Sequence, residues 1–141
     1  IIGSATCCAE IIDQMGDIDI LIIPIGGGGL IAGMAHYLEE INSSVELLGV
    51  EPTGADSFAQ SLENGSAVRI NKVETIADSL GAPMAMDFSF NIAKKRVNQV
   101  EKVTDDEIRR AMITMRDRLG FIVEPACATS LAGLLERYKK K

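Results

Sequence analysis

Four consecutive glycines, Gly26 to Gly29, are the residues of this sequence best suited to bind a charged ligand. They follow an apolar run over 18–25 and precede apolar residues at the helical spacing of positions 30, 31, 34, 38 and 41. Backbone N–H groups of a loop without side chains can converge on one anion, and the positive end of the following helix dipole attracts the same charge. The sequence therefore predicts a phosphate-binding loop between a strand and a helix.

Two acidic residues follow other short apolar runs. Glu51 comes directly after the run over 46–50, and Glu124 comes directly after Phe121, Ile122 and Val123. In open α/β sheets, ligands bind at the carboxyl ends of the strands. We therefore expect the tetraglycine, Glu51 and Glu124 to share one edge of a sheet.

The elements that must position these residues alternate between helix and strand. We expect strands over 20–25, 46–50 and 121–123, each short and apolar on both faces. We expect helices over 6–15, 30–41, 56–62, 88–95 and 105–119 and a last helix with Leu131, Leu134, Leu135 and Tyr138 on its apolar face, while periodicity is lost over 66–90. This pattern is typical of an α/β fold in which helices cover both faces of a parallel sheet.

The clearest helix start lies at Asp105. Thr104 and Glu107 have the T-x-x-E spacing of a capping box, and Val103 and Ile108 are placed to form a hydrophobic staple. Gly16 stands where a C-terminal cap of the first helix is expected.

Composition restricts the partners and the compartment. The formal net charge is −6, and basic residues are scattered except at Lys139–Lys141, so a nucleic-acid partner is not expected. Cys7, Cys8 and Cys127 form neither a disulfide framework nor a CxxC metal pair, which favours the reducing cytoplasm. The apolar stretch over 20–35 is interrupted by Pro24 and the glycines, so no membrane span is expected. The first residues resemble neither an initiator nor a signal peptide, and we expect the chain to be part of a longer protein.

The residues alone leave the ligand open. Gly27, Gly29 and Ala32 fit G-x-G-x-x-A, and Glu51 stands about where a ribose-binding acid belongs, so a dinucleotide-binding domain of an oxidoreductase is one hypothesis. A non-catalytic module that binds a phosphorylated small molecule is another, and a glycine run that only makes a tight turn is a third. The P-loop pattern G-x-x-x-x-G-K-[ST] is absent.

Five motifs in register resemble one enzyme family. They are Ile23–Gly33, Gly49-Val50-Glu51-Pro52, Thr75-Ile76-Ala77-Asp78, Val103–Ile108 and Glu124-Pro125-Ala126-Cys127-Ala128. In order and interval they resemble the threonine/serine dehydratases, which are pyridoxal-phosphate enzymes of the tryptophan-synthase β-like fold and include serine racemase. The resemblance implies that residues 1–141 are one partial domain, a segment of the large domain, without the small domain.

The resemblance also implies roles for single residues. The backbone amides of Gly26, Gly27, Gly28, Gly29 and Leu30 would hold the phosphate of pyridoxal 5′-phosphate. The segment with Ser79 would pass beside the pyridine ring, at a position where relatives often have glycine. Glu124 matches an acid near the cofactor, although a carboxylate at a helix entry would look the same.

A cation site is implied at low specificity. Glu51 and the carbonyl of Ala55 correspond to ligands of a divalent or monovalent cation in serine-racemase-like members. The third ligand there is an acid, and this chain has Ser57 in its place, with Asp56 one residue earlier.

The implied reaction is a β-elimination that removes water from a small hydroxy amino acid, serine or threonine, and gives a 2-oxo acid and ammonia. Racemisation on the same fold is the alternative. None of Lys72, Lys94, Lys95 and Lys102 has the family's serine-aromatic-lysine setting, so the Schiff-base lysine is expected upstream. We therefore expect the chain to be inactive alone, and a homo-oligomer or the rest of the enzyme to cover its exposed faces.

Overall fold

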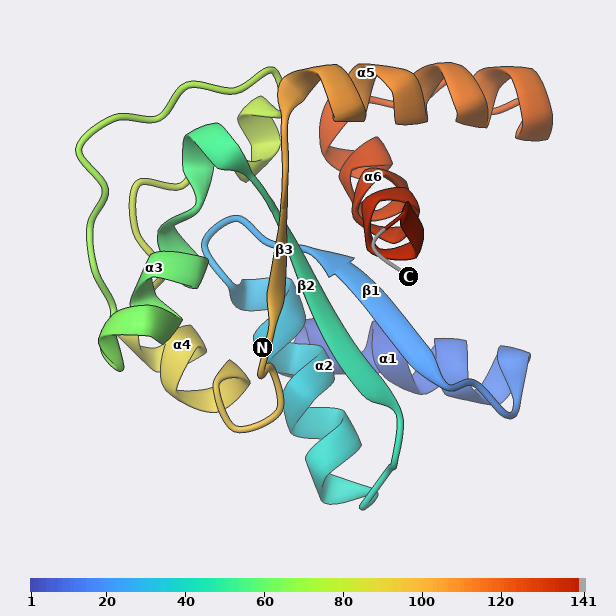
Figure 1. Cartoon of the computed structure of the whole chain (residues 1–141). Coiled ribbons are helices and arrows are strands. Elements are labelled where there is room, and N and C mark those ends of the chain that lie inside the picture. Colours follow the sequence, from blue (N-terminus) through green and yellow to red (C-terminus); the bar gives the residue numbers. More distant parts are fainter. Residues whose placement is uncertain (140–141) are drawn as a thin grey trace.

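A three-stranded parallel sheet forms the centre of the molecule (Figure 1). The computed structural model describes residues 1–139. The strands β1 (Ile20–Pro24), β2 (Glu46–Pro52) and β3 (Val100–Val103) lie in the order β1-β2-β3. The sheet confirms the predicted parallel arrangement, because β2 pairs in parallel with both of its neighbours.

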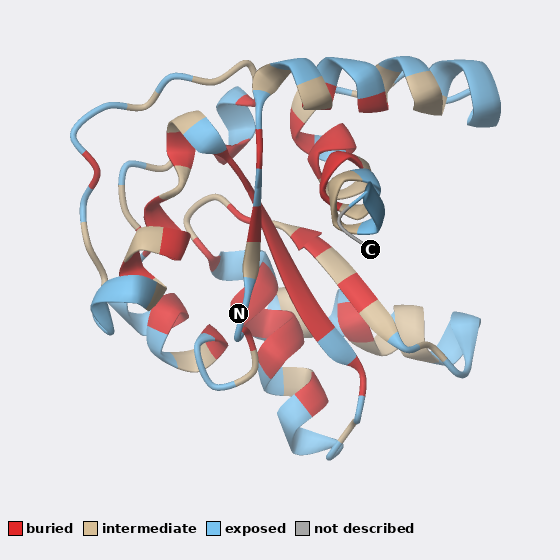
Figure 2. Cartoon of the chain, viewed as in Figure 1, coloured by how far each residue is buried: buried red, intermediate tan, exposed pale blue. Residues whose placement is uncertain are grey.

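Helices cover both faces of this sheet. The helices are α1 (Ile2–Met15), α2 (Gly29–Glu40), α3 (Ser57–Asn64), α4 (Asp87–Ala93), α5 (Asp105–Thr114) and α6 (Pro125–Lys139). One buried apolar cluster joins α1, α2 and α4 to the sheet, and a second joins α5 and α6 to it. Figure 2 shows buried residues concentrated along β2 and on the sides of the helices that face the sheet. Within residues 1–139, none of the helices combines the length and hydropathy needed to cross a bilayer.

Several predicted boundaries are confirmed. Gly16 ends α1 with φ +71°, and its N–H donates to the carbonyl of Ile12. The side chains and backbones of Thr104 and Glu107 form both bonds of the capping box. Val103 and Ile108, the predicted staple, are both fully buried in the second cluster. Helix α1 begins at Ile2, four residues before its predicted start.

One predicted strand is wrong and one observed strand was not predicted. Residues 121–123 lie outside the sheet, and Phe121 and Ile122 are 59% and 92% exposed. The third strand is instead β3, whose sequence Val-Glu-Lys-Val has two charged residues. Apolar content favoured the wrong segment because β3 lies at the edge of the sheet, where Lys102 can remain exposed.

The predicted apolar face of α6 is only partly confirmed. Leu131 packs against the second cluster, but Leu135 and Tyr138 are exposed, and the buried residues of α6 are small. A Cβ at Gly133 would lie 2.5 Å from a methyl carbon of Val50, so α6 lies too close to β2 for large side chains. Lys139 ends α6, whereas Lys140 and Lys141 lie outside the described residues.

We expect Gly33→Ala to destabilise the full-length protein. A Cβ at Gly33 would lie 2.5 Å from Cβ of Ser4 and 2.6 Å from the carbonyl oxygen of Ile1, where α1 crosses α2. Overpacking of this kind costs about 1–3 kcal/mol of the free energy of unfolding. Gly3→Ala on α1 is the control, because a Cβ there meets nothing within 4 Å. Urea unfolding should separate the two variants, and equal midpoints would contradict the close crossing.

Candidate anion-binding site

A pocket of about 350 Å³ lies beyond the carboxyl end of β1. It brings together the glycine loop, the turn at Asp78–Leu80 and the start of α6, which are far apart in the sequence. The pocket is lined by all the residues that were predicted to contact the phosphate or the cofactor that carries it: Gly26, Gly27, Gly28, Gly29, Leu30, Ser79 and Glu124. The structure thus places these predicted residues around one cavity.

The fold explains why glycine is present at two of the four positions. A Cβ at Gly26 would lie 3.2 Å from Cα of Leu80, and Gly28 has φ +85°, which L side chains rarely adopt. A Cβ at Gly27 or Gly29 would meet nothing within 4 Å. The fold does not itself require glycine at positions 27 and 29, and the space beside these two residues is free.

The N-terminus of α2 supplies the attraction for an anion. The N–H of Ala32 donates to the carbonyl of Gly28 at 3.0 Å, so the N–H groups of Gly29, Leu30 and Ile31 precede the first bond of the helix. The lining residues include no Lys or Arg. An anion in this pocket would therefore be bound by backbone N–H groups and the helix dipole.

Two phenylalanines support the loop from behind. A Cβ at Gly28 would lie 3.6 Å from ring atoms of Phe58, and the rings of Phe58 and Phe90 pack edge to face with centroids 5.4 Å apart. Both side chains are buried. Sequence analysis did not assign them to the site, because an apolar residue in a helix gives no sign of which loop it supports.

A hydrogen bond crosses the pocket wall between two of the predicted residues. The hydroxyl of Ser79 donates to Oε2 of Glu124 at 3.2 Å. The turn that carries Ser79 is fixed in turn by Asp105, whose carboxylate accepts the hydroxyl of Thr75 at 2.7 Å and the N–H of Ile76 at 3.1 Å. The first turn of α5 therefore anchors the segment that leads into the turn of Ser79.

Removal of the Asp105 carboxylate should displace this turn. Hydrogen bonds to charged groups contribute about 1.5–3 kcal/mol each when buried, and these are part-buried, so we expect Asp105→Ala to cost about 1–3 kcal/mol of the free energy of unfolding. Asp106→Ala is the control, because Asp106 is exposed and pairs only with Arg109 in the contacts described. Thermal unfolding of the full-length variants checks the difference, and similar melting temperatures would show that Asp105 does not fix the turn.

Glu51 lies elsewhere, which overturns its place in the dinucleotide hypothesis. It is fully buried and does not line the pocket; its Oε1 accepts the N–H of Phe58 at 2.9 Å and its Oε2 accepts the N–H of Ala59 at 2.8 Å. Burial raises the pKa of Glu51 to about 8, against the lowering effect of these two N–H groups. Ala55 is buried in the neighbouring turn Thr53–Ala55, ahead of α3.

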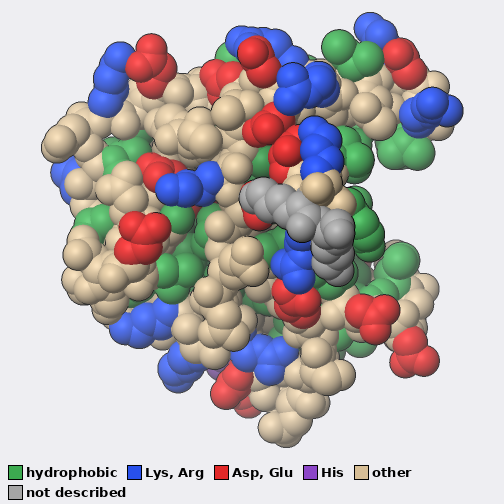
Figure 3. All heavy atoms as spheres, in the orientation of Figure 1, with side chains coloured by type: hydrophobic (Ala, Val, Ile, Leu, Met, Phe, Trp, Pro, Cys, Tyr) green, Lys and Arg blue, Asp and Glu red, His purple; other side chains and the backbone are tan. Residues whose placement is uncertain are grey.

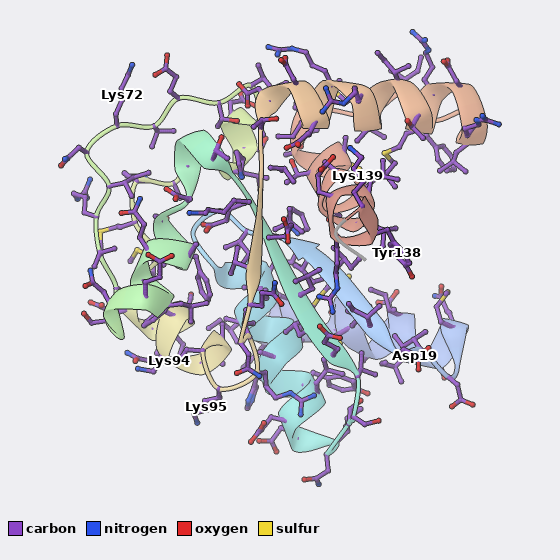
Figure 4. The ribbon with its side chains drawn as sticks, in the orientation of Figure 1. Asp19, Lys72, Lys94, Lys95, Tyr138 and Lys139 are labelled. Atoms are coloured by element: carbon purple, nitrogen blue, oxygen red, sulfur yellow. The ribbon has the colours of Figure 1, made fainter. Side chains whose placement is uncertain are left out.

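The lysines lie away from the pocket. Figure 4 shows Lys72 on the outer side of the loop that follows α3, and Lys94 and Lys95 directly after α4. Lys72 pairs with Glu74, and the ammonium of Lys94 lies 5.2 Å from the ring centroid of Phe90. None of the described lysines lines the pocket.

The described surface carries both signs of charge. Figure 3 shows acidic and basic side chains intermingled over the viewed face, without a continuous basic stripe.

All three cysteines are free: Cys8 is buried in α1, Cys7 is exposed on the same helix, and Cys127 is exposed in the first turn of α6, where it lines the pocket.

Comparison with known proteins gives concordant matches. The family model described as pyridoxal-phosphate dependent enzyme matches residues 1–141. The phenylserine dehydratase of Ralstonia pickettii is 41% identical, over 96% of this chain and 41% of that protein. The catabolic L-threonine dehydratase of Escherichia coli K12 is 33% identical, over 98% of this chain and 43% of that protein. The solved structure of maize serine racemase matches with a TM-score of 0.91 at 36% identity, over 99% of this chain and 44% of that one. The chain thus spans less than half the length of these relatives.

Proposed function

Because the chain belongs to the family of pyridoxal-phosphate dependent enzymes, we propose that Gly26–Gly29 and Leu30 bind the cofactor phosphate in a dehydratase of small hydroxy amino acids. One observation carries this proposal: the helix N-terminus of α2 opens into a pocket whose wall is free at Gly27 and Gly29. A phosphate is a compact anion that suits such a group of N–H donors. The fit rests on the backbone, which explains the absence of Lys and Arg from the lining.

The residues of this chain would bind and orient. The N–H groups at the start of α2 would fix the phosphate, and Ser79 and Glu124 would form the wall beside the ring. When bound, pyridoxal phosphate supplies an electron sink for the bonds at the α-carbon of an amino acid. The Schiff-base lysine would lie upstream of residue 1, and this segment would then be inactive alone.

The proposed reaction is the loss of water from serine or threonine, with a 2-oxo acid and ammonia as products. The dehydratases among the relatives support this reaction. Racemisation of serine is the second candidate, because the maize serine racemase matches this chain over nearly its whole length. Residues 1–141 would be part of the large domain in either case.

The full-length gene product provides the test. We expect a visible absorption band that borohydride abolishes, with the cofactor mass fixed to a lysine upstream of Ile1, and release of 2-oxo acid from L-threonine or L-serine. Formation of D-serine without 2-oxo acid would favour the racemase. Absence of the band, together with fluorescence enhancement of added NADH, would overturn the assignment.

We also propose a cation site at Glu51 and the carbonyl of Ala55. Ser57 supports it, because its buried hydroxyl oxygen has no hydrogen-bond partner and the next residue donates its N–H to Glu51. The donor set would be one carboxylate, one carbonyl and one hydroxyl, which suits a hard cation that also takes water. Mg²⁺, Ca²⁺ or K⁺ should raise the melting temperature of the full-length protein, and Glu51→Gln should remove that response. An equal response in both proteins would exclude this site.

Two further expectations belong to this proposal. Free cysteines on the described surface support a reducing compartment, the cytoplasm. Exposed apolar residues at the end of α5 and after it, including Ile113, Leu119 and Ile122, support a covered surface in a homo-oligomer. Size-exclusion chromatography of the full-length protein tests the second expectation.

A further inference from the structure

The Ser79–Glu124 contact joins two elements that both contribute to the pocket wall. Ser79 lies in the turn Asp78–Leu80, and Glu124 immediately precedes α6. The two side chains are 45 residues apart in the sequence, and their bond is 3.2 Å long. Both residues line the pocket that the glycine loop also lines.

Glu124 is the single charged side chain among the lining residues given for this pocket. A glutamate side chain rotates about several bonds, so an exposed carboxylate samples many positions unless a donor restrains it. The Ser79 hydroxyl is such a donor, and it acts on one of the two oxygens, Oε2. The hydroxyl therefore selects an orientation of the carboxylate within the site.

We propose that Ser79 is a positioning residue that orients the Glu124 carboxylate toward the bound cofactor and substrate. This inference rests on the proposed function. A carboxylate in one orientation presents a constant field to the group beside it, and preorganised charge of this kind contributes to catalysis when charge develops in the transition state. Loss of the hydroxyl would lower turnover more than it would weaken substrate binding.

A purely structural role makes a different prediction. Both side chains are exposed, so the bond itself adds little to the stability of the fold. If the bond only joined the turn to α6, its removal would change the melting temperature slightly and leave the cofactor spectrum unchanged. The spectrum and the kinetic constants therefore separate the two roles.

The test is a double-mutant cycle in the full-length holoenzyme, with Ser79→Ala, Glu124→Gln and the double variant. We expect each single variant to lower kcat for L-threonine about three- to tenfold with little change in KM, since an exposed hydrogen bond to a charged group is worth only about 1 kcal/mol. The double variant should lose no more than Glu124→Gln alone. Ser79→Thr, which keeps the hydroxyl, should recover kcat and the wild-type absorption band.

A matched control is Thr6→Val, which removes an exposed hydroxyl bond to the carbonyl of Gly3 on α1 and should change neither readout. Independent, multiplicative losses in the double variant, or an unchanged cofactor band in Ser79→Ala, would overturn the positioning role while the wild-type band and turnover stand. A wild-type enzyme without the band or without turnover would overturn the proposed function, and this inference with it.

Discussion

Replacement of Gly29 by aspartate should abolish retention of pyridoxal phosphate while the protein stays folded. Gly29 is the first residue of α2, and a Cβ there meets nothing within 4 Å. An aspartate in the first turn interacts favourably with the positive end of the helix dipole, so the fold should tolerate it. Its carboxylate would nevertheless face the cofactor phosphate, and like charges about 4 Å apart repel by about 4 kcal/mol near a protein surface. The dissociation constant should therefore rise roughly 1,000-fold.

The measurement is cofactor titration of the full-length protein by absorption, with circular dichroism as the test of folding. Gly29→Ala should have a smaller effect, because it adds bulk without charge. Gly3→Asp is the matched control, since Gly3 lies in the first turn of α1 and is equally open. A Gly29→Asp variant that binds the cofactor as tightly as Gly3→Asp would show that the phosphate lies elsewhere.

Phe58→Ala should have the largest effect on stability. Its side chain is fully buried against Phe90, and truncation of a buried phenylalanine costs about 3–5 kcal/mol of the free energy of unfolding. The ring also lies beneath Gly28, so the remaining folded protein should bind the cofactor more weakly. The prediction thus joins stability and binding at one residue.

Denaturant unfolding and cofactor titration of the same full-length preparations check this expectation. Phe88→Ala is the control, because Phe88 is 71% exposed and its loss should change stability by less than about 0.5 kcal/mol. If Phe58→Ala unfolded at the same denaturant concentration as Phe88→Ala, the support of the glycine loop by Phe58 would be wrong.

Local rules predicted much of the fold. The T-x-x-E box located the start of α5, the glycine run located the turn between β1 and α2, and alternation of elements predicted the parallel sheet. The likeness to maize serine racemase confirms the tryptophan-synthase β-like fold. Apolar content failed to locate the third strand for two reasons. An edge strand such as β3 tolerates charged residues, and the sequence of residues 121–123 does not show that Phe121 and Ile122 are exposed.

The candidate site was predictable where it depends on the backbone. Glycine and the helix start determine the N–H cradle, and both can be recognised in the sequence. The apolar pattern alone did not distinguish the two carboxylates, because Glu51 and Glu124 both follow apolar runs, whereas the family resemblance assigned only Glu124 to the cofactor. In the structure, Glu51 accepts the N–H groups of α3, and Glu124 lies at the pocket. Packing supplies what the apolar pattern lacks, namely the burial of Glu51 and the exposure of Glu124.

We propose that the cofactor phosphate occupies the pocket of the glycine loop, and the three cysteines allow a direct measurement of that occupancy. Cys127 lines that pocket, Cys7 is exposed outside it and Cys8 is buried. In one alkylation experiment, Cys127 therefore reports on the pocket, Cys7 is the exposed control and Cys8 is the buried control. The full-length protein, freed of cofactor, would be treated with iodoacetamide at increasing pyridoxal phosphate, and the modified peptides would be quantified by mass spectrometry. We predict that Cys127 becomes protected in parallel with cofactor uptake while Cys7 reacts unchanged. If Cys127 reacted as fast in the cofactor-saturated protein as in the cofactor-free protein, the cofactor would not occupy this pocket.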